Sequence, residues 1–217
     1  MRRAVILANG EIGDEAQARR RLEALRGAIV IAANGGSHHA RPLGLHPDLV
    51  IGDLDSLAPR LRRELDAAGA RIEEAPARKD ETDLELALLR AVEGGAQHVV
   101  VLGALGGRLD MTVANILLLT HPAFEGVRVE LWAGAQTAWL VRPPGGPLPG
   151  APGDTVSLIP VGGEAQHVTT HGLEYPLRGE ALLVGPARGV SNVIAAAPAR
   201  VELGGGLLLA IHTPGRA

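Results

Sequence analysis

The chain has 217 residues, a formal net charge of -3 at pH 7 and no cysteine. This length allows one large domain or two small ones with real cores. The small negative charge gives no electrostatic reason to expect a nucleic-acid partner, and without cysteine neither disulfides nor thiolate metal sites can form. No stretch approaches the roughly 20 apolar residues of a membrane-spanning helix, and the apolar run after Met1 is too short for a secretory signal peptide. A soluble cytoplasmic protein is therefore expected.

The N-terminal part alternates short β-branched runs with helical patterns, which predicts a parallel sheet with covering helices. The helix expected at 84–93 has the clearest pattern, because its apolar residues share one face and Thr82 and Glu85 can form a capping box. Ser56 is the expected N-cap of the helix at 57–68. The expected strands are 5–7, 29–32, 49–51, 99–102 and 127–131. The expected helices are 14–25, 57–68, 84–93 and 113–119.

Proline and glycine are frequent at 142–153, which predicts a linker or long loop. Short apolar runs follow it without a helical period, so strands are expected at 155–159, 165–169, 182–184, 199–203 and 207–212. The predicted fold class is α/β, with an N-terminal Rossmann-like parallel sheet and covering helices, plus a C-terminal all-β sandwich or roll. The predicted domains are 1–133 and 134–217.

Three acidic motifs, G-D-L-D-S at 52–56, K-D-E-T-D at 79–83 and G-G-R-L-D at 106–110, fall where predicted strands give way to helices. Such junctions meet at one edge of an α/β sheet, where these folds bind ligands. Carboxylates brought together there repel by about 4 kcal/mol per pair at ~4 Å and an effective dielectric near ~20, so they need a cation. Asp53 and Asp55 point to the same side of an extended segment and suit Mg²⁺, although the motif taken alone could also be a turn acid followed by a helix cap. The motifs together predict a Mg²⁺-nucleotide site.

The other two motifs can each be read in two ways. Asp83 in the first turn of a helix interacts favourably with the helix dipole, but the same turn and Lys79, the only lysine in the chain, could face a phosphate. The glycines before Arg108 form an ordinary loop or let the backbone approach a nucleotide, with the guanidinium on phosphate oxygens. The pattern G-x-x-x-x-G-K-[ST] is missing from the sequence, which excludes a Walker-type phosphate loop.

Taken together, these residues resemble the thiamine pyrophosphokinase (thiamine diphosphokinase) family. The matching elements span nearly the whole chain: A-N-G-G at 33–36, P-D-L-V-I-G-D-L-D-S at 47–56, K-D-E-T-D-L-E-L-A at 79–87, G-A-L-G-G-R-L-D at 103–110, S-L-I-P at 157–160, G-L-E-Y-P-L at 172–177 and R-G-V-S-N at 188–192. The resemblance implies an enzyme that makes thiamine diphosphate and AMP from thiamine and ATP with Mg²⁺. It also implies a homodimer with thiamine bound between the α/β domain of one subunit and the β domain of the other.

The resemblance further assigns roles by position. Asp53, Asp55 and Asp83 would hold the metal, and the catalytic acids would be Asp53, Asp55, Asp80, Asp83 and Asp110. ATP would contact Asn34, Gly35, Gly36, Lys79, Thr82, Gly107 and Arg108. Thiamine would contact Asp48, Ser191 and Asn192. Two positions depart from the family pattern, since Asn34 replaces the usual aspartate and Met111 a common histidine.

Three alternatives differ in what they require. A pyrophosphokinase acting on a hydroxymethyl-pterin would share the acidic motifs, but the C-terminal β domain argues against it. A D-x-D glycosyltransferase would not be expected to carry the second and third motifs. A non-catalytic nucleotide or thiamine sensor would follow if Asn34 and Met111 mark lost catalysis.

Overall fold

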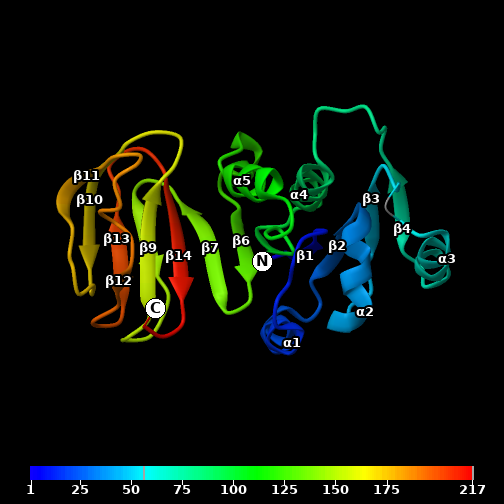
Figure 1. Cartoon of the computed structure of the whole chain (residues 1–217), viewed down its shortest axis with the longest axis horizontal. Helices are drawn as coiled ribbons and strands as arrows, with labels where there is room; N and C mark the ends of the chain where they lie inside the picture. The colour runs from blue at the N-terminus through cyan, green and yellow to red at the C-terminus, as the bar shows by residue number, and fades with distance from the viewer. Residues whose placement is uncertain (56, 217) are drawn as a thin grey trace. The chain divides into compact units, whose positions relative to one another are not determined.

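The computed structural model describes residues 1–55 and 57–216. Internal contacts divide the chain into two compact units, Met1–Gly134 and Ala135–Ala217. Figure 1 labels their helices and strands. The expected domain boundary lies one residue earlier in the chain. None of the helices in the described residues has both the length and the apolar character needed to cross a membrane.

Unit 1 contains a parallel sheet whose strand order is β6-β5-β1-β2-β3-β4. Consecutive strands β1 to β4 run outward in one direction, and the chain then returns to place β5 on the other side of β1. This reversal makes a switch point between β1 and β5, the position at which open α/β sheets bind ligands. The strands are β1 (Arg3–Leu7), β2 (Ile29–Ala33), β3 (Leu49–Gly52), β4 (Arg71–Glu74), β5 (His98–Leu102) and β6 (Arg128–Ala133).

Helices cover both faces of this sheet (Figure 1). One face packs on α1 (Glu15–Leu22), η1 (Glu23–Leu25), α2 (Ala40–Leu43) and α3 (Pro59–Ala67). The short helix η2 (Asn34–His39) follows β2 and contacts β1, β2 and β3. The other face contacts α4 (Asp83–Glu93), on the side where Figure 1 also shows α5 (Leu109–Leu118), which is followed by η3 (Pro122–Phe124). The residues of β1, β2, β3 and β5 are almost all buried, as expected for a parallel sheet covered on both sides, whereas β4 at the edge is partly exposed. The predicted α/β architecture is confirmed.

Local capping explains where two of the helices begin. The Thr82 hydroxyl accepts a hydrogen bond from the Glu85 N–H at 3.1 Å, so the predicted N-terminus of α4 is confirmed. Helix α3 begins at Pro59, two residues later than expected, because proline is favoured in the first helical turn and Ala58 takes the cap position. The expected cap, Ser56, lies outside the described residues.

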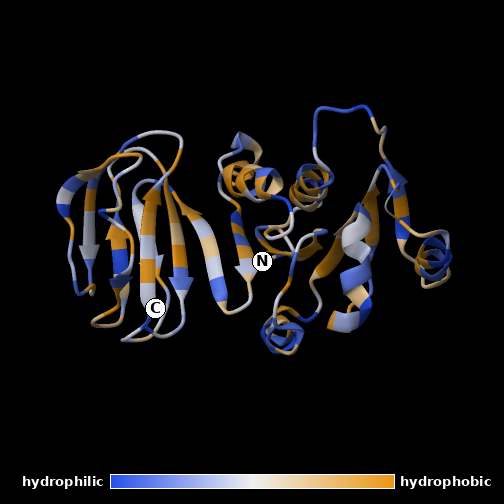
Figure 2. Cartoon of the chain, in the orientation of Figure 1, coloured by the Kyte–Doolittle hydropathy of each residue, from blue (hydrophilic) through white to orange (hydrophobic). Residues whose placement is uncertain are grey.

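Unit 2 consists of antiparallel strands in two sheets. The first has the order β12-β9-β14-β7 and the second β11-β10-β13-β8. The strands are β7 (Gln136–Val141), β8 (Gly145–Leu148), β9 (Thr155–Pro160), β10 (Ala165–His171), β11 (Arg178–Leu182), β12 (Asn192–Val193), β13 (Ala199–Glu202) and β14 (Leu208–Thr213). Long hydrophobic stretches mark β7, β9 and β14 in Figure 2, and residues of both sheets share one apolar core. The predicted β-sandwich is confirmed.

Two local expectations for unit 2 were wrong. The Gly/Pro-rich segment 142–153 contains β8, which pairs only with β13 at the edge of its sheet, a position where Pro147 is tolerated. The apolar run 182–184 is not a strand, because β11 ends at Leu182 and the side chains of Leu183 and Val184 are exposed.

Candidate active site

A cavity of about 470 Å³ lies at the carboxyl ends of β1, β2, β3 and β5 in unit 1. These strand ends flank the switch point between β1 and β5, so the topology and the cavity indicate the same edge of the sheet. The cavity is lined by Ala8, Asn9, Gly10, Ala33, Asn34, Gly35, Asp53, Asp55, Asp83, Leu84, Gly103, Ala104, Gly106, Gly107, Arg108, Met111 and Asn115.

Asn34 connects the two aspartates of the first acidic motif. It follows β2 directly, is only 6 % exposed and has a left-handed backbone with φ of 46°, which asparagine tolerates better than most residues. Its Nδ2 donates to Asp53 Oδ1 at 2.7 Å and to Asp55 Oδ1 at 3.0 Å. The amide therefore holds the two carboxylates together and offsets part of their repulsion.

Gly52, at the end of β3, allows the acidic residues to approach one another. A Cβ at this position would lie 2.8 Å from Asn34 Cβ and 2.9 Å from Asp83 Cγ, and the backbone φ is +150°. Any side chain here would displace the asparagine or the aspartate. Asn34, which follows β2, and Asp83, on α4, thus both pack closely against Gly52.

Asp83 is paired with the lysine of its own motif. Lys79 Nζ lies 2.9 Å from Asp83 Oδ1, and the two side chains are 12 % and 24 % exposed. The lysine lies in the loop four residues before Asp83, the first residue of α4, and the ion pair places its ammonium next to the acidic side of the cavity. This part of the site carries charges of both signs.

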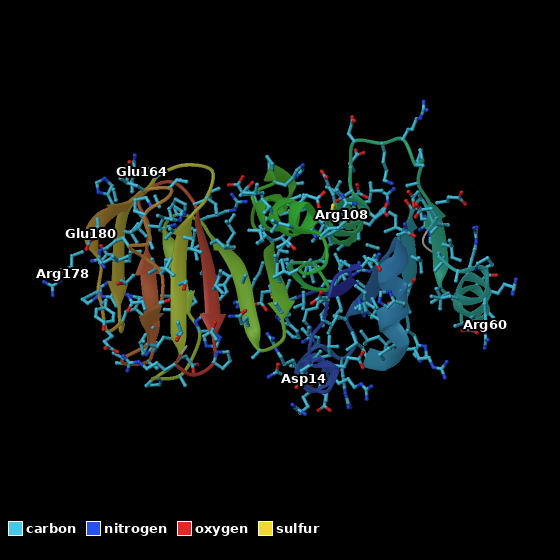
Figure 3. All side chains as sticks on the ribbon, viewed as in Figure 1. Asp14, Arg60, Arg108, Glu164, Arg178 and Glu180 are labelled. Carbon is cyan, nitrogen blue, oxygen red and sulfur yellow. The ribbon has the colours of Figure 1, made fainter. Side chains whose placement is uncertain are left out.

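Arg108 provides a second cation at the cavity, just before α5 (Figure 3). It forms an ion pair with Asp110, and both side chains are largely exposed. The hydrogen bond between them raises the pKa of Arg108 and, together with the Met111 backbone N–H, lowers the pKa of Asp110. Both groups therefore stay charged, and the guanidinium is free of any deep burial that would hinder its approach to a phosphate.

The donor set of the cavity suits a hard cation such as Mg²⁺, since Asp53, Asp55 and Asp83 offer carboxylate oxygens. Within the described residues, however, no three acidic or histidine side chains are grouped closely enough to ligate one ion. Mg²⁺ usually takes one or two carboxylates and completes its shell with water and phosphate oxygens. The residues therefore fit an ion that arrives with a phosphate ligand, and they do not make an all-protein cage.

Buried polar atoms without hydrogen-bond partners are concentrated at this cavity. Over residues 1–55 and 57–216 they are Asn34 Oδ1, Asp83 Oδ1, Asn115 Oδ1 and His98 Nε2. The first three belong to lining residues, and all three are acceptors. Lys79 Nζ lies close to the Asp83 atom without meeting hydrogen-bond geometry. Because buried polar groups are almost always satisfied, these oxygens indicate that the cavity receives a cation or hydrogen-bond donors.

In unit 2, Ser191 and Asn192 differ sharply in their surroundings. Asn192 is 6 % exposed, its Oδ1 accepts from the N–H groups of Tyr175 and Val193, and its Nδ2 donates to the Tyr175 carbonyl. Ser191 is exposed and has a left-handed backbone with φ of 56°. Asn192 thus fixes the loop around Tyr175, whereas Ser191 presents its side chain outward.

Two family models match the chain in the same order as its two units. Residues 23–131 match the model described as "Thiamin pyrophosphokinase, catalytic domain", and residues 147–208 match "Thiamin pyrophosphokinase, vitamin B1 binding domain". The chain belongs to the thiamine pyrophosphokinase family.

Individual relatives agree with this assignment. The chain is 28% identical over 172 residues to a thiamine pyrophosphokinase of Bacillus subtilis, which covers 78% of this chain and 80% of the relative. It is 29% identical over 165 residues to thiamine pyrophosphokinase 1 of Oryza sativa, covering 68% of this chain and 59% of that longer protein.

Solved structures of thiamine pyrophosphokinases share the fold. The crystal structure of the Bacillus subtilis protein superimposes with a TM-score of 0.86 at 23% identity, covering 98% of this chain and 99% of the other. The Geobacillus thermodenitrificans structure gives a TM-score of 0.83 at 23% identity, covering 100% and 99%.

The positions that the family resemblance assigns to the ATP and metal site fall into two groups. Those that line the cavity are Asn34, Gly35, Asp53, Asp55, Asp83, Gly107 and Arg108, and Lys79 reaches it through Asp83. Those outside its lining are Gly36, Asp80, Thr82 and Asp110. Gly36 packs under β1, where a Cβ would lie 2.1 Å from the Leu7 carbonyl oxygen, and Thr82 caps α4. Asp80 and Asp110 are exposed.

Asp48, assigned to thiamine by the resemblance, lies at the amino end of β3. Its Oδ2 accepts a hydrogen bond from the Val30 N–H at 2.7 Å, and it lines a different cavity beside Arg71 and Arg90. The sheet therefore separates Asp48 from the acidic cavity of its own unit, because the two lie at opposite ends of β3.

Sequence reasoning did not anticipate Asn115 or the two histidines of η2. Asn115 is a polar residue within the otherwise apolar stretch V-A-N-I-L-L, and that contrast was the available signal. The rings of His38 and His39 are in contact at a tilt of 42°, with centroids 3.7 Å apart. They donate to the carbonyls of Gly35 and Gly10, which connects two cavity loops. Burial lowers the pKa of His39. Contacts of this kind depend on packing between loops and cannot be read from spacing.

Proposed function

We propose that the chain transfers the pyrophosphoryl group of ATP to thiamine, giving thiamine diphosphate and AMP. The observation that carries this proposal is the acidic cavity at the switch point of unit 1, in a chain whose two halves match the catalytic and vitamin-B1-binding models of one enzyme family. We assign ATP and Mg²⁺ to residues 1–133 and thiamine to residues 134–217.

Asp53 and Asp55 would hold Mg²⁺ together with phosphate oxygens, and Asp83 would join them once Lys79 turns to the triphosphate. The bound ion would neutralise phosphate charge and align the reacting groups. Support comes from Asp83 Oδ1, which has an ion pair with Lys79 but no hydrogen bond, and from Asn34, whose amide donates to both carboxylates. Among the other proposed catalytic acids, Asp80 and Asp110 would act from the rim.

The remaining cavity groups suit a triphosphate. Lys79 and Arg108 supply positive charge, and the glycine backbone at Gly35 and Gly107 allows close approach without side chains. Asn34 contributes indirectly by holding the carboxylate of Asp53 with its amide. Thr82 contributes by capping α4, and Gly36 by its packing under β1. Rate enhancement would come from positioning and electrostatics more than from covalent catalysis.

The reaction is an in-line substitution at the β-phosphorus. The thiamine hydroxyl oxygen forms a bond to this phosphorus while the bond to the α,β-bridging oxygen breaks, and that oxygen leaves with AMP. The hydroxyl proton passes to an acceptor, for which an aspartate of the cavity is available. Holding both substrates in line supplies most of the advantage over solution.

For thiamine, we assign a direct contact to Ser191 and a supporting role to Asn192. The exposed serine with a left-handed backbone can reach a ligand, whereas the buried amide of Asn192 is engaged with Tyr175 and Val193. If Asp48 contacted thiamine, the thiamine site would lie at the amino end of β3, opposite the end that carries the acidic cavity.

A homodimer with thiamine between subunits is supported by an apolar stripe on α5. Leu109, Val113 and Leu117 are 78%, 49% and 48% exposed and recur at helical spacing on one face. A second copy of the chain is the proposed cover for this stripe. Sedimentation of the Val113→Glu variant tests it: a dimeric wild type and a monomeric variant are expected, and a monomeric wild type would contradict the proposal.

The test of function is a product assay with ATP, Mg²⁺ and either thiamine or a hydroxymethyl-pterin. AMP formed only with thiamine is expected, in line with the match to a vitamin-B1-binding domain. Binding without AMP would instead favour a sensor. Asp55→Asn should abolish turnover with the fold intact, whereas Asp66→Asn, on the exposed side of α3, should leave it unchanged. Near-native activity of Asp55→Asn would remove Asp55 from the metal site.

A further inference from the structure

Asn115 is a buried amide in the cavity wall whose orientation is fixed by the backbone. It is 6 % exposed, and its Nδ2 donates to the Ala104 carbonyl at 2.7 Å. Because a carbonyl can only accept, the amide cannot be turned around, and Oδ1 points away from Ala104. This Oδ1 is buried without a partner. A buried acceptor left unpaired is unfavourable, so its retention requires an explanation.

The surroundings of Asn115 differ from the acidic side of the cavity. Lining residues from the end of β1 (Ala8, Asn9, Gly10) and from α5 (Met111, Asn115) carry no charge. The carboxylates come from the ends of β3 and the start of α4. An amide oxygen beside alanine and methionine is a neutral acceptor in an apolar wall, which suits a flat heterocycle with one N–H donor more than a phosphate or a cation.

Asn115 Oδ1 is covered in this structure, and Met111 lies one turn before Asn115 on the same face of α5, so the proposed access of a ligand to this atom requires the Met111 side chain to move. Its unbranched thioether side chain adapts readily and packs well on aromatic rings. The cavity therefore combines an acidic end, a cationic rim at Arg108 and an uncharged wall with one fixed acceptor.

We propose that Asn115 Oδ1 accepts a hydrogen bond from the exocyclic amino group of adenine and thereby selects ATP. The inference rests on the proposed function for the identity of the nucleotide. Asn115 then acts as a specificity-determining residue, with Ala104 holding its amide in the selective orientation and the phosphates extending toward the carboxylates.

The experiment measures binding of nucleotides to the whole chain without thiamine, by calorimetry, so that it is independent of turnover. Three ligands are compared: ATP, purine riboside triphosphate, which lacks only the amino group, and 3′-deoxy-ATP, which lacks a ribose hydroxyl. The wild type should bind ATP about tenfold more tightly than purine riboside triphosphate, the value of one hydrogen bond to a buried acceptor. Its affinities for ATP and 3′-deoxy-ATP should be similar.

Variants separate contact from packing. In Asn115→Leu the preference for ATP over purine riboside triphosphate should fall to about one, since the acceptor is gone. Met111→Leu alters the same wall without a polar group and should keep the preference. If Asn115→Leu does not fold, Asn115→Ala also removes the acceptor and should lose the preference in the same way.

Each contrary outcome overturns the assignment. Equal wild-type affinity for ATP and purine riboside triphosphate would mean that Asn115 serves a bound water or the fold alone. Discrimination that depends on the ribose hydroxyl, or that persists in Asn115→Leu, would place the base elsewhere. A wild type that binds no ATP would refute both this inference and the proposed function, whereas ATP binding without thiamine turnover would refute only the latter.

Discussion

Lys79 Nζ lies 2.9 Å from Asp83 Oδ1, and only 12 % of the lysine side chain is exposed. In a chain that otherwise uses arginine, the single lysine sits at the acidic cavity. A compact ammonium can leave a carboxylate and contact a phosphate oxygen, whereas the larger guanidinium has a fixed planar geometry. The ion pair with Asp83 therefore keeps the Lys79 ammonium next to the cavity in which the triphosphate is expected to bind.

Replacing Lys79 by methionine tests this role. We expect the KM for ATP to rise by about ten- to hundredfold, the loss of one charged hydrogen bond of about 1.5–3 kcal/mol. The variant should also lose about 1–2 kcal/mol of stability, a value between those of exposed and buried pairs, because Asp83 is left unpaired. Steady-state kinetics and urea unfolding measure the two effects.

The double variant Lys79→Met/Asp83→Asn separates stability from function. Without the orphaned carboxylate the unfolding free energy should recover, while the weak ATP binding should persist. An unchanged KM for ATP in Lys79→Met would show that the lysine only neutralises Asp83.

Asn34→Asp places an additional negative charge next to Asp53 and Asp55. The variant loses two charge-assisted hydrogen bonds and adds a third carboxylate beside Asp53 and Asp55. Without metal, its free energy of unfolding should be lower than that of the wild type by about 2 kcal/mol. Added Mg²⁺ should raise its Tm by more than that of the wild type, because ligands that bind the folded state stabilise it in proportion to their affinity.

Asn9→Asp, at another lining residue, is the matched control for added charge alone. Its Mg²⁺-dependent Tm shift should match that of the wild type. Equal shifts in all three proteins would show that Asn34 does not regulate cation binding.

The sequence was sufficient to locate the acidic edge of the sheet, because parallel strands end on the same side and the motifs at 52–56 and 79–83 follow strands or begin helices. It could not show that Asn34 would span Asp53 and Asp55, since that contact joins residues about twenty positions apart through a left-handed backbone. Nor could it show that Asp83 would face a lysine in place of a metal.

Two of the strands that were not expected, β4 and β8, were missed for the same physical reason. β4 has the sequence R-I-E-E and β8 has G-G-P-L, so neither carries a β-branched apolar pattern. Both lie at sheet edges, where pairing with one neighbour suffices and charged residues or proline are tolerated. The exposed run at Leu183 and Val184 shows the converse, since apolar character alone does not make a strand.

Substitutions at Ser191 and Asn192 should have opposite consequences. Asn192→Leu leaves the N–H groups of Tyr175 and Val193 without their acceptor, so we expect a loss of about 2–4 kcal/mol in unfolding free energy. Ser191→Gly relieves a left-handed backbone and should keep or improve stability, while the KM for thiamine rises and the KM for ATP stays constant. A stable Asn192→Leu protein with weak thiamine binding would instead make the amide a direct ligand.

Glu130, on β6, should make the stability of unit 1 depend on pH in the acid range. Burial alone would raise the pKa of Glu130, but interactions with His98, Trp132 and Arg128 lower it from 4.5 to about 2. Its Oε1 accepts from Arg128 Nε at 2.6 Å and its Oε2 from Trp132 Nε1 at 2.9 Å, with the side chain 8% exposed.

Because the folded-state pKa of Glu130 lies below the unfolded value, the stabilisation is complete above about pH 4.5 and is lost as the pH falls toward about 2. A shift of this size corresponds to about 3 kcal/mol. In Glu130→Gln, the unfolding free energy measured with urea should therefore depend less steeply on pH across that window. Glu64→Gln, at an exposed pair on α3, should keep the wild-type slope. Parallel pH profiles for Glu130→Gln and the wild type would mean that the carboxylate does not titrate with unfolding.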